Sequence, residues 1–258
     1  WKTIVLPAGE AHKHMLTVSS IIEQLIGLEA DRQSTLVGVG GGVITDLAGF
    51  VAAIYMRGIA FGFVPTSILA MVDASIGGKN GVDVGVYKNM AGIIRQPKFL
   101  LYDVTLLKTL PEQEWINGFA EIIKHACIKD AAMFKQLQVN DLAFYQKKKV
   151  ELQKLIERNV KIKAKVVQTD EFEKADRKLL NYGHTLGHAI ENELQLPHGF
   201  AISIGMVYAA HLSQKLSGLK PAAVNHIIEV LEKYGLPTHA QIDMAQAFDI
   251  LKMDKKRQ

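Results

Sequence analysis

The chain of 258 residues contains a single cysteine, Cys127, and this scarcity excludes a framework of internal disulfides. Its neighbours Ala126 and Ile128 are apolar, which indicates a buried thiol rather than a reactive one and fits a reducing cytosol. No apolar run approaches the roughly 20 residues that cross a bilayer, and the first residues lack the layout of a secretory signal. We therefore expect a soluble, cytoplasmic protein with no membrane partner.

Neither sign of charge dominates the sequence. The 30 basic and 26 acidic residues are interspersed, and no basic run is interleaved with aromatic residues. This pattern argues against nucleic acid as a partner, and an anionic small-molecule substrate accounts for the net charge of +4 equally well. With 48% hydrophobic residues, the chain can bury a substantial core and lies near the size at which cores divide into two domains.

The hydrophobic periodicity changes at Pro111. Before it, short β-rich runs alternate with helical stretches, which predicts a largely parallel sheet, whereas only helical periods follow. Proline suits the first turn of a helix, because its missing N–H costs nothing there. We therefore expect an α/β domain over 1–110 and an all-α domain over 111–258. The expected strands are 3–6, 35–39, 60–64 and 99–103, and the expected helices are 21–28, 43–56, 111–129, 150–169, 179–194, 199–216 and 221–234.

A glycine turn, Gly40-Gly41-Gly42, separates an expected strand from an expected helix. Bare backbone N–H groups and a helix N-terminus at such a turn can receive a pyrophosphate. The match to the dinucleotide fingerprint is partial, because its last glycine would fall on Val43, so a plain tight turn is the alternative. Asp46, one turn into the helix, is equally well explained as a charge favoured by the helix dipole.

A second polar, glycine-rich segment covers 71–81 and is followed closely by Lys88 and Asn89. We interpret it as a loop in which Lys79, Lys88 and Asn89 clamp an oxyanion through charge-assisted hydrogen bonds. The alternative is an exposed loop with ordinary surface lysines.

Histidines and one carboxylate suggest a metal site in the helical half. Glu121 and Lys124 share one face of an apolar helix, where a buried charge needs a partner, although a surface salt bridge would also explain the pair. His184 and His188 lie one turn apart, and His198 begins the next helix. Two imidazoles and a carboxylate with an open fourth position are typical of catalytic zinc, and spacing alone favours His184 and His188 as the imidazoles.

Lys163 and Arg177 flank this cluster in the sequence, and Asn181 shares a helical stripe with its histidines. Their position favours contact with a polyanionic substrate over simple surface charge.

Several motifs occur in one order along almost the whole chain, and together they resemble the 3-dehydroquinate synthases, a family of sugar-phosphate cyclases. The motifs are GGGVITDLAGF at 40–50, YMRG at 55–58, VPTS at 64–67, VDASIGGK at 72–79, AEIIK at 120–124 and NYGHTLGHA at 181–189. The resemblance implies a Rossmann-like NAD-binding domain followed by an all-α metal-binding domain. It also implies zinc, with cobalt as a possible substitute, a homodimer, and conversion of 3-deoxy-D-arabino-heptulosonate 7-phosphate to 3-dehydroquinate and phosphate.

The resemblance also implies roles for individual residues. It assigns zinc to Glu121, His184 and His198, which moves the second imidazole from His188 to His198. Groups around the substrate ring and carboxylate are Asp73, Lys124, Lys163 and Arg177. The phosphate contacts are Lys79, Asn89, Asn181, His188, Lys256 and, from the neighbouring subunit, Arg57. The NAD contacts are Glu10, Lys13, Gly40, Gly41, Gly42, Asp46, Thr66, Ser67, Lys79, Lys88, Asp103 and Thr105.

Two features depart from the family pattern. Phe200 stands two residues after His198, where many relatives have a glutamate that could support the metal histidine. The family is also longer at both ends, so we expect a truncated chain that lacks the first strand of the nucleotide domain. Three alternatives remain: a related cyclase acting on another sugar phosphate, a polyol or iron-type alcohol dehydrogenase, and an inactive fragment that only folds or dimerises.

Overall fold

The protein is described by a computed structural model that covers residues 1–85, 87–171 and 173–242. It divides into two compact units, Trp1–Leu110 and Pro111–Gln258. Among the described residues, none of the helices combines the length and the apolar character that spanning a bilayer would require.

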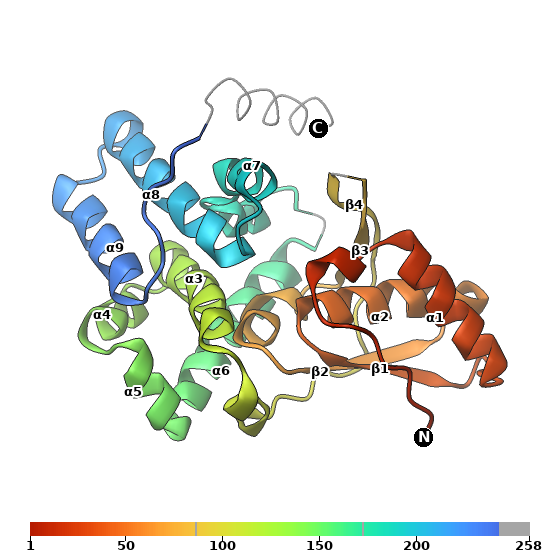
Figure 1. Cartoon of the computed structure of the whole chain (residues 1–258). Helices are drawn as coiled ribbons and strands as arrows, with labels where there is room; N and C mark the ends of the chain where they lie inside the picture. The colour runs from red at the N-terminus through yellow and green to blue at the C-terminus, as the bar shows by residue number, and fades with distance from the viewer. Residues whose placement is uncertain (86, 172, 243–258) are drawn as a thin grey trace. The chain divides into compact units, whose positions relative to one another are not determined.

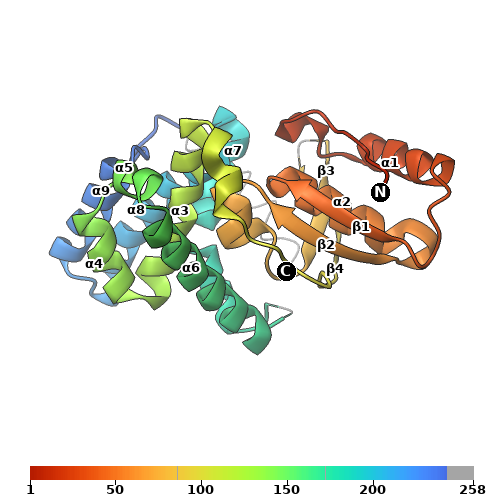
Figure 2. The same cartoon turned by 90° about the horizontal axis from the view of Figure 1, so that it is seen from below.

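The first unit is built around a helix packed on two parallel strands. Strand β1, Thr35–Gly40, pairs in register with β2, Ala60–Pro65, and helix α2, Gly42–Ile54, connects them. On its other side α2 meets helix α1, Met15–Gly27 (Figure 2). The core that these helices and strands share is apolar, and burying it stabilises this unit. Its buried side chains include Val18, Ile21, Leu47, Val51, Phe61 and Phe63.

An antiparallel hairpin completes this unit and was not expected from the sequence. Strand β3, Lys79–Val84, pairs with β4, Tyr87–Ile94, with an irregularity between Val82 and Val84. The segment predicted as one loop over 71–81 is instead a turn of π-helix, Ala70–Ala74, followed by the start of β3. Short 3-10 helices occupy Glu10–His12, Tyr55–Arg57 and Val104–Thr109.

Two predicted strands of the first unit are wrong or reduced. Residues 3–6 form no strand, although Ile4 and Leu6 pack against the core. Residues 99–103 make a single parallel bridge, Phe63 to Leu100, rather than a strand. Apolar side chains at these positions pack against the core without strand pairing of the backbone. The hydrophobic pattern alone therefore could not show whether the backbone pairs.

The described part of the second unit, 111–171 and 173–242, is helical and contains no strand (Figure 1). Its helices α3, Glu112–Lys129, α6, Lys149–Thr169, α8, His198–Ser217, and α9, Pro221–Lys233, match predicted helices closely. Two shorter helices, α4, Ala131–Val139, and α5, Leu142–Lys147, were not predicted. Aspartate side chains cap both N-termini, a local signal that hydrophobic periodicity does not contain.

The predicted helix 179–194 is divided in two. A 3-10 helix, η5, covers Asp176–Asn181, and α7 begins only at His184 and ends at Leu194. Between them Gly183 has φ 81°, a left-handed conformation that an L-residue adopts at a cost. The break therefore follows from Gly183, and it places His184 at the first position of α7.

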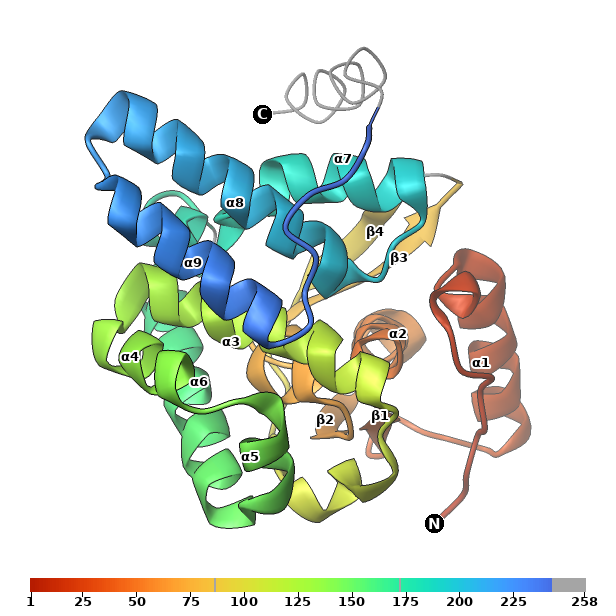
Figure 3. The ribbon, with the colours of Figure 1, turned by 60° about the vertical axis from the view of Figure 1, so that its left-hand side comes forward.

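Helices α7 and α8 approach each other so closely that only glycines fit at the contact. A Cβ atom on Gly205 would lie 2.0 Å from the backbone oxygen of Gly183, and one on Gly187 would lie 2.6 Å from the Ile202 side chain. Helix α8 also packs on α3 and α9, with α8 and α9 side by side in Figure 3. The close approach brings the first residues of α7 and α8 near the buried middle of α3.

Candidate active site

A fully buried carboxylate, that of Glu121, lies in the helical unit. It lies on α3, it has no solvent exposure, and it forms an ion pair with Lys124 one turn further along the same helix. Burying two charges costs free energy that their attraction must offset. Such a pair in the middle of an otherwise apolar helix is therefore more consistent with a functional site than with a surface salt bridge.

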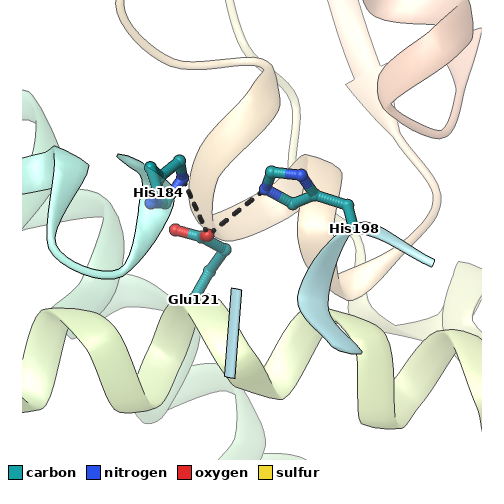
Figure 4. Close-up of side chains that lie close together, drawn as sticks. All are labelled: Glu121, His184 and His198. Carbon is teal, nitrogen blue, oxygen red and sulfur yellow. Dashed lines mark ion pairs between the residues drawn. The ribbon is translucent and has the colours of Figure 1, made fainter. Parts of the chain in front are cut away.

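Two histidines from different helices face this carboxylate. The Nε2 atoms of His184 and His198 each lie 3.5 Å from Oε1 of Glu121 (Figure 4). One ligand atom from each of the three residues lies within 4.8 Å of the others, a spacing that suits a divalent ion. The donor set of two imidazoles and one carboxylate fits catalytic zinc, because it leaves a position for a further ligand.

Hydrogen bonding at the other ring nitrogens supports this geometry. Nδ1 of His184 lies 3.2 Å from the backbone oxygen of Tyr182, and Nδ1 of His198 lies 3.1 Å from Oε2 of Glu191. When each imidazole is neutral and its proton sits on Nδ1, donated to these oxygens, Nε2 has its lone pair available for a metal. This is the tautomer that a metal ligand requires.

The two imidazoles differ in proton affinity. Burial lowers the pKa of His184 well below its ordinary value, and the positive charge of Lys124 lowers it further. Burial also acts to lower the pKa of His198, but hydrogen bonds with Glu121 and Glu191 raise it to about 9. A divalent cation at this position would therefore replace a proton held at His198.

His188 stands beside this group rather than in it. Its ring centroid is 5.3 Å from that of His184 and 6.1 Å from that of His198. Its ligand atoms group with Glu191 and His198, not with Glu121. The pair expected from one-turn spacing is thus not the pair that the fold sets around the buried carboxylate.

Three buried cations come from elements of this unit that pack against one another. Lys124 on α3, Lys163 on α6 and Arg177 on η5 are 1%, 7% and 3% exposed, and α3, α6 and η5 make mutual contacts. Arg177 donates from Nη1 to the backbone oxygen of Glu171 at 2.5 Å. Three cationic side chains from adjoining elements give this unit donors that can form charge-assisted hydrogen bonds with an anionic ligand.

Two further residues of this unit were expected at the site, Asn181 and Lys256. Asn181 is exposed and donates from Nδ2 to Oε1 of Glu173 at 2.5 Å. Lys256 lies outside the described residues.

In the first unit, the glycine turn opens onto the loop that follows β2. Gly41 is the N-cap of α2 and has no side chain to offer the first turn of the helix. The backbone N–H of Thr66 donates to the oxygen of Gly40 at 2.9 Å, and a Cβ on Gly41 would lie 3.4 Å from Oγ of Ser67. The turn, Thr66 and Ser67 are therefore neighbours at the carboxyl ends of parallel strands, where open α/β sheets bind ligands.

Charged residues gather near this turn in the first unit. Nζ of Lys13, which is buried, lies 2.6 Å from Oδ2 of Asp46, and Nζ of Lys88 lies 3.3 Å from Oε1 of Glu10. Burial lowers the pKa of Lys13, but the charges of Asp46 and Glu10 outweigh it and raise that pKa overall.

Asp83 belongs to the same unit and was not expected from the sequence. Its Oδ1 accepts a hydrogen bond from the backbone N–H of Asn89 at 2.6 Å. The alternation of apolar and polar residues along 82–84 was the sequence signal that could have indicated this strand and the polar side chain of Asp83.

The hairpin separates two of the expected phosphate contacts. Lys79 begins β3 opposite Ile94, whereas Asn89 lies on β4 nearer the turn, where its backbone N–H donates to the Asp83 side chain.

The remaining expected residues of the first unit have local roles in the structure. Asp103 caps η4, Val104–Thr109, by accepting hydrogen bonds from the backbone and side chain of Thr105 at 2.8 and 2.7 Å. Asp73 lies in the π-helical turn. Arg57 is exposed and has φ 67°.

Comparison with known proteins gives matches over nearly the whole chain. A family model described as 3-dehydroquinate synthase N-terminal matches residues 3–117, and one described as 3-dehydroquinate synthase C-terminal matches 118–257. The 3-dehydroquinate synthase of Acetivibrio thermocellus is 42% identical over 255 residues, which are 98% of this chain and 71% of that protein.

Two solved structures are also similar. A 2-epi-5-epi-valiolone synthase from Streptomyces hygroscopicus, with NAD⁺ and Zn²⁺ bound, has a TM-score of 0.91 and 27% identity over 98% of this chain and 71% of its own. A 2-deoxy-scyllo-inosose synthase, complexed with carbaglucose-6-phosphate, NAD⁺ and Co²⁺, has a TM-score of 0.86 and 31% identity over 95% of this chain and 68% of its own.

Proposed function

We propose that this chain, which belongs to the 3-dehydroquinate synthase family, converts 3-deoxy-D-arabino-heptulosonate 7-phosphate to 3-dehydroquinate and phosphate. The observation that carries the proposal is the group of Glu121, His184 and His198, with its buried cations in the same unit. The higher identity with dehydroquinate synthases than with the two other cyclases favours this substrate over another sugar phosphate.

Zinc, or cobalt in its place, is proposed to be held by Glu121, His184 and His198. When bound, the metal supplies Lewis acidity that lowers the pKa of a substrate hydroxyl. NAD is proposed to occupy the glycine turn of residues 1–110, a Rossmann-like domain, and supplies reversible hydride acceptance when bound. Residues 111–258 form the zinc- and substrate-binding domain in this proposal.

In this proposal, the residues of the second unit form two groups, one that binds the substrate carboxylate and one that binds its phosphate. Lys124, Lys163 and Arg177 bind the carboxylate and ring oxygens of the substrate, because their charges are buried and its carboxylate is negative. His188, Asn181 and Lys256 are the residues of this unit proposed to bind the phosphate. His188 lies beside the metal group, close enough to bind the substrate without joining the ligand set.

The residues of the first unit position the cofactor. Backbone N–H groups at Gly41 and Gly42 face the pyrophosphate at the start of α2, with Thr66 and Ser67 adjacent. Asp46 would lie near the nicotinamide, and its ion pair with Lys13 holds its side chain in place. Glu10 and Lys88, which form an ion pair, would contact the nucleotide, and Asp103 and Thr105 would line the site.

Release of inorganic phosphate from the heptulosonate phosphate, with NAD at far below the substrate concentration, tests this function. We expect many turnovers per NAD and no accumulation of NADH, because oxidation and reduction occur at one bound cofactor. Stoichiometric growth of NADH absorbance would support a dehydrogenase instead. Turnover of a different sugar phosphate alone would support a related cyclase. Failure to bind both zinc and NAD in a titration would identify an inactive chain.

A further inference from the structure

We infer that Glu191 is a positioning residue for the metal site. It fixes the ring orientation and the tautomer of His198 through Nδ1, the ring nitrogen that does not face Glu121. The inference rests on the proposed metal site but goes beyond its ligands. Glu191 lies on α7, seven residues after His184, and is 8% exposed. Its Oε2 lies 3.1 Å from Nδ1 of His198, while Nε2 of the same ring faces Glu121.

The two nitrogens of His198 have separate tasks in this arrangement. One imidazole cannot offer both nitrogens to one ion, so a metal bound through Nε2 leaves Nδ1–H to donate to Glu191. A carboxylate acceptor at this position orients the ring and increases the basicity of the ligating nitrogen. His184 has only a backbone carbonyl, that of Tyr182, in the equivalent place. His198 is therefore the imidazole whose donor strength depends on a side chain.

The contact between Glu191 and His198 matters more because Phe200 follows Gly199. The residue that follows Gly199 carries no acceptor, so the turn containing His198 does not provide the supporting carboxylate itself. Helix α7 provides one instead, because the close glycine packing of α7 on α8 sets Glu191 against the first residue of α8. One helix thus carries a proposed ligand at its start and the support of the other ligand two turns later.

Glu191 also belongs to a second possible donor group, with His188 and His198. The two groups share His198 and are alternatives. We favour the group with Glu121, because Glu121 is fully buried and both facing imidazoles present Nε2 to it. If the second group bound the ion, Glu191 would be a ligand, and its loss would change the coordination.

The test measures metal affinity in the full chain by competition with a chromophoric chelator, using Zn²⁺ and Co²⁺. Glu191→Ala is expected to weaken binding about 10- to 100-fold, the range seen when outer partners of metal histidines are removed. Glu191→Gln retains an oxygen acceptor and should recover part of that loss. Glu229→Gln, on an exposed position of α9, is the matched control and should bind like the unmodified chain.

Spectroscopy separates positioning from direct ligation and from general damage. The Co²⁺ d–d bands should keep the intensity typical of their coordination number in both Glu191 variants and shift only slightly in position, because the ligand set is unchanged while the donor strength of His198 falls. The hydrogen-bonded Nδ1–H proton of His198 in the zinc form should disappear from the proton spectrum of Glu191→Ala and persist in Glu191→Gln. A change in band intensity to that of another coordination number would show that Glu191 is a ligand and would overturn the inference, as would unchanged affinity in Glu191→Ala.

A parallel Glu121→Ala variant distinguishes failure of the positioning role from failure of the metal site. If it abolishes metal binding while Glu191→Ala has no effect, the role of Glu191 is wrong and the proposed metal site stands. If Glu121→Ala binds metal as well as the unmodified chain, the proposed site itself is wrong.

Discussion

Oδ1 of Asn117 accepts a hydrogen bond of 2.6 Å from the backbone N–H of Gly199. Asn117 lies on α3 one turn before Glu121, and Gly199 directly follows His198. The N-cap of α8 is Pro197, whose side chain has no acceptor, so a neighbouring helix caps α8 in its place. The Asn117 amide also donates to Glu114 at 3.1 Å, which fixes its orientation. One hydrogen bond thus joins the helices of two proposed metal ligands.

Replacing Asn117 with alanine should destabilise the protein by about 1–3 kcal/mol, because the buried N–H of Gly199 loses its acceptor. Metal affinity should fall as well, since His198 is no longer held in register with Glu121. Urea unfolding and chelator competition measure the two effects. Asn225→Ala, at an exposed position of α9, is the control. Unchanged stability in Asn117→Ala would show that water replaces the cap.

Gly199→Ala should be more damaging than the loss of the cap. The new Cβ would lie 2.1 Å from the backbone oxygen of Asn117, so α8 must move away from α3. Overpacking of this kind typically costs about 1–3 kcal/mol and occasionally more, and we expect the upper part of this range. Gly27→Ala is a contrasting control, because nothing lies within 4 Å of its Cβ position at the end of α1. A melting temperature that does not change in Gly199→Ala would contradict the close contact between α3 and α8.

We predict that Arg57 acts on the active site of a second subunit, in the homodimer that the family resemblance implies. Met56, Arg57 and Gly58 have φ values of 49°, 67° and 117°, a costly sequence of conformations for the two non-glycine residues. The turn exposes Arg57, and its planar guanidinium suits a phosphate. We therefore expect Arg57→Ala to raise KM and lower kcat/KM.

A mixture of subunits tests whether Arg57 acts across the interface. Random mixing of Arg57→Ala with Lys163→Ala should restore about a quarter of the unmodified activity, because half of the dimers are mixed and each has one intact site. Each variant alone is the control for residual activity. Mixed dimers that stay inactive would show that Arg57 serves its own subunit or none.

Cys127 should be unreactive in the folded protein. Burial raises the pKa of its thiol to about 12, so at pH 8 the reactive thiolate is scarce. We expect slow labelling by a thiol reagent in the native chain and rapid labelling of one thiol in urea. The folded-state pKa exceeds the unfolded one, so this group contributes no pH dependence below pH 9, and above it stability falls as pH rises toward 12. Native labelling as fast as in urea would disprove the shift.

Elements with local signals could be predicted from the residues alone. Glycines and a short hydrophobic run marked β1, and helical periodicity marked α3, α6, α8 and α9, because side-chain period follows directly from backbone geometry. Residue types also indicated a metal site, and the family motifs implied which residues form it.

The choice of metal histidines depends on residues distant in the chain, and it follows from the tertiary fold. Spacing relates only neighbours on one helix, so it favoured His188 beside His184. The fold instead sets His198 opposite Glu121, because Gly183, Gly187 and Gly205 let α7 and α8 pack closely and Asn117 caps α8. The support of His198 by Glu191 has the same origin. A contact between helices depends on how near two backbones can approach, and no pattern along a single helix specifies that distance.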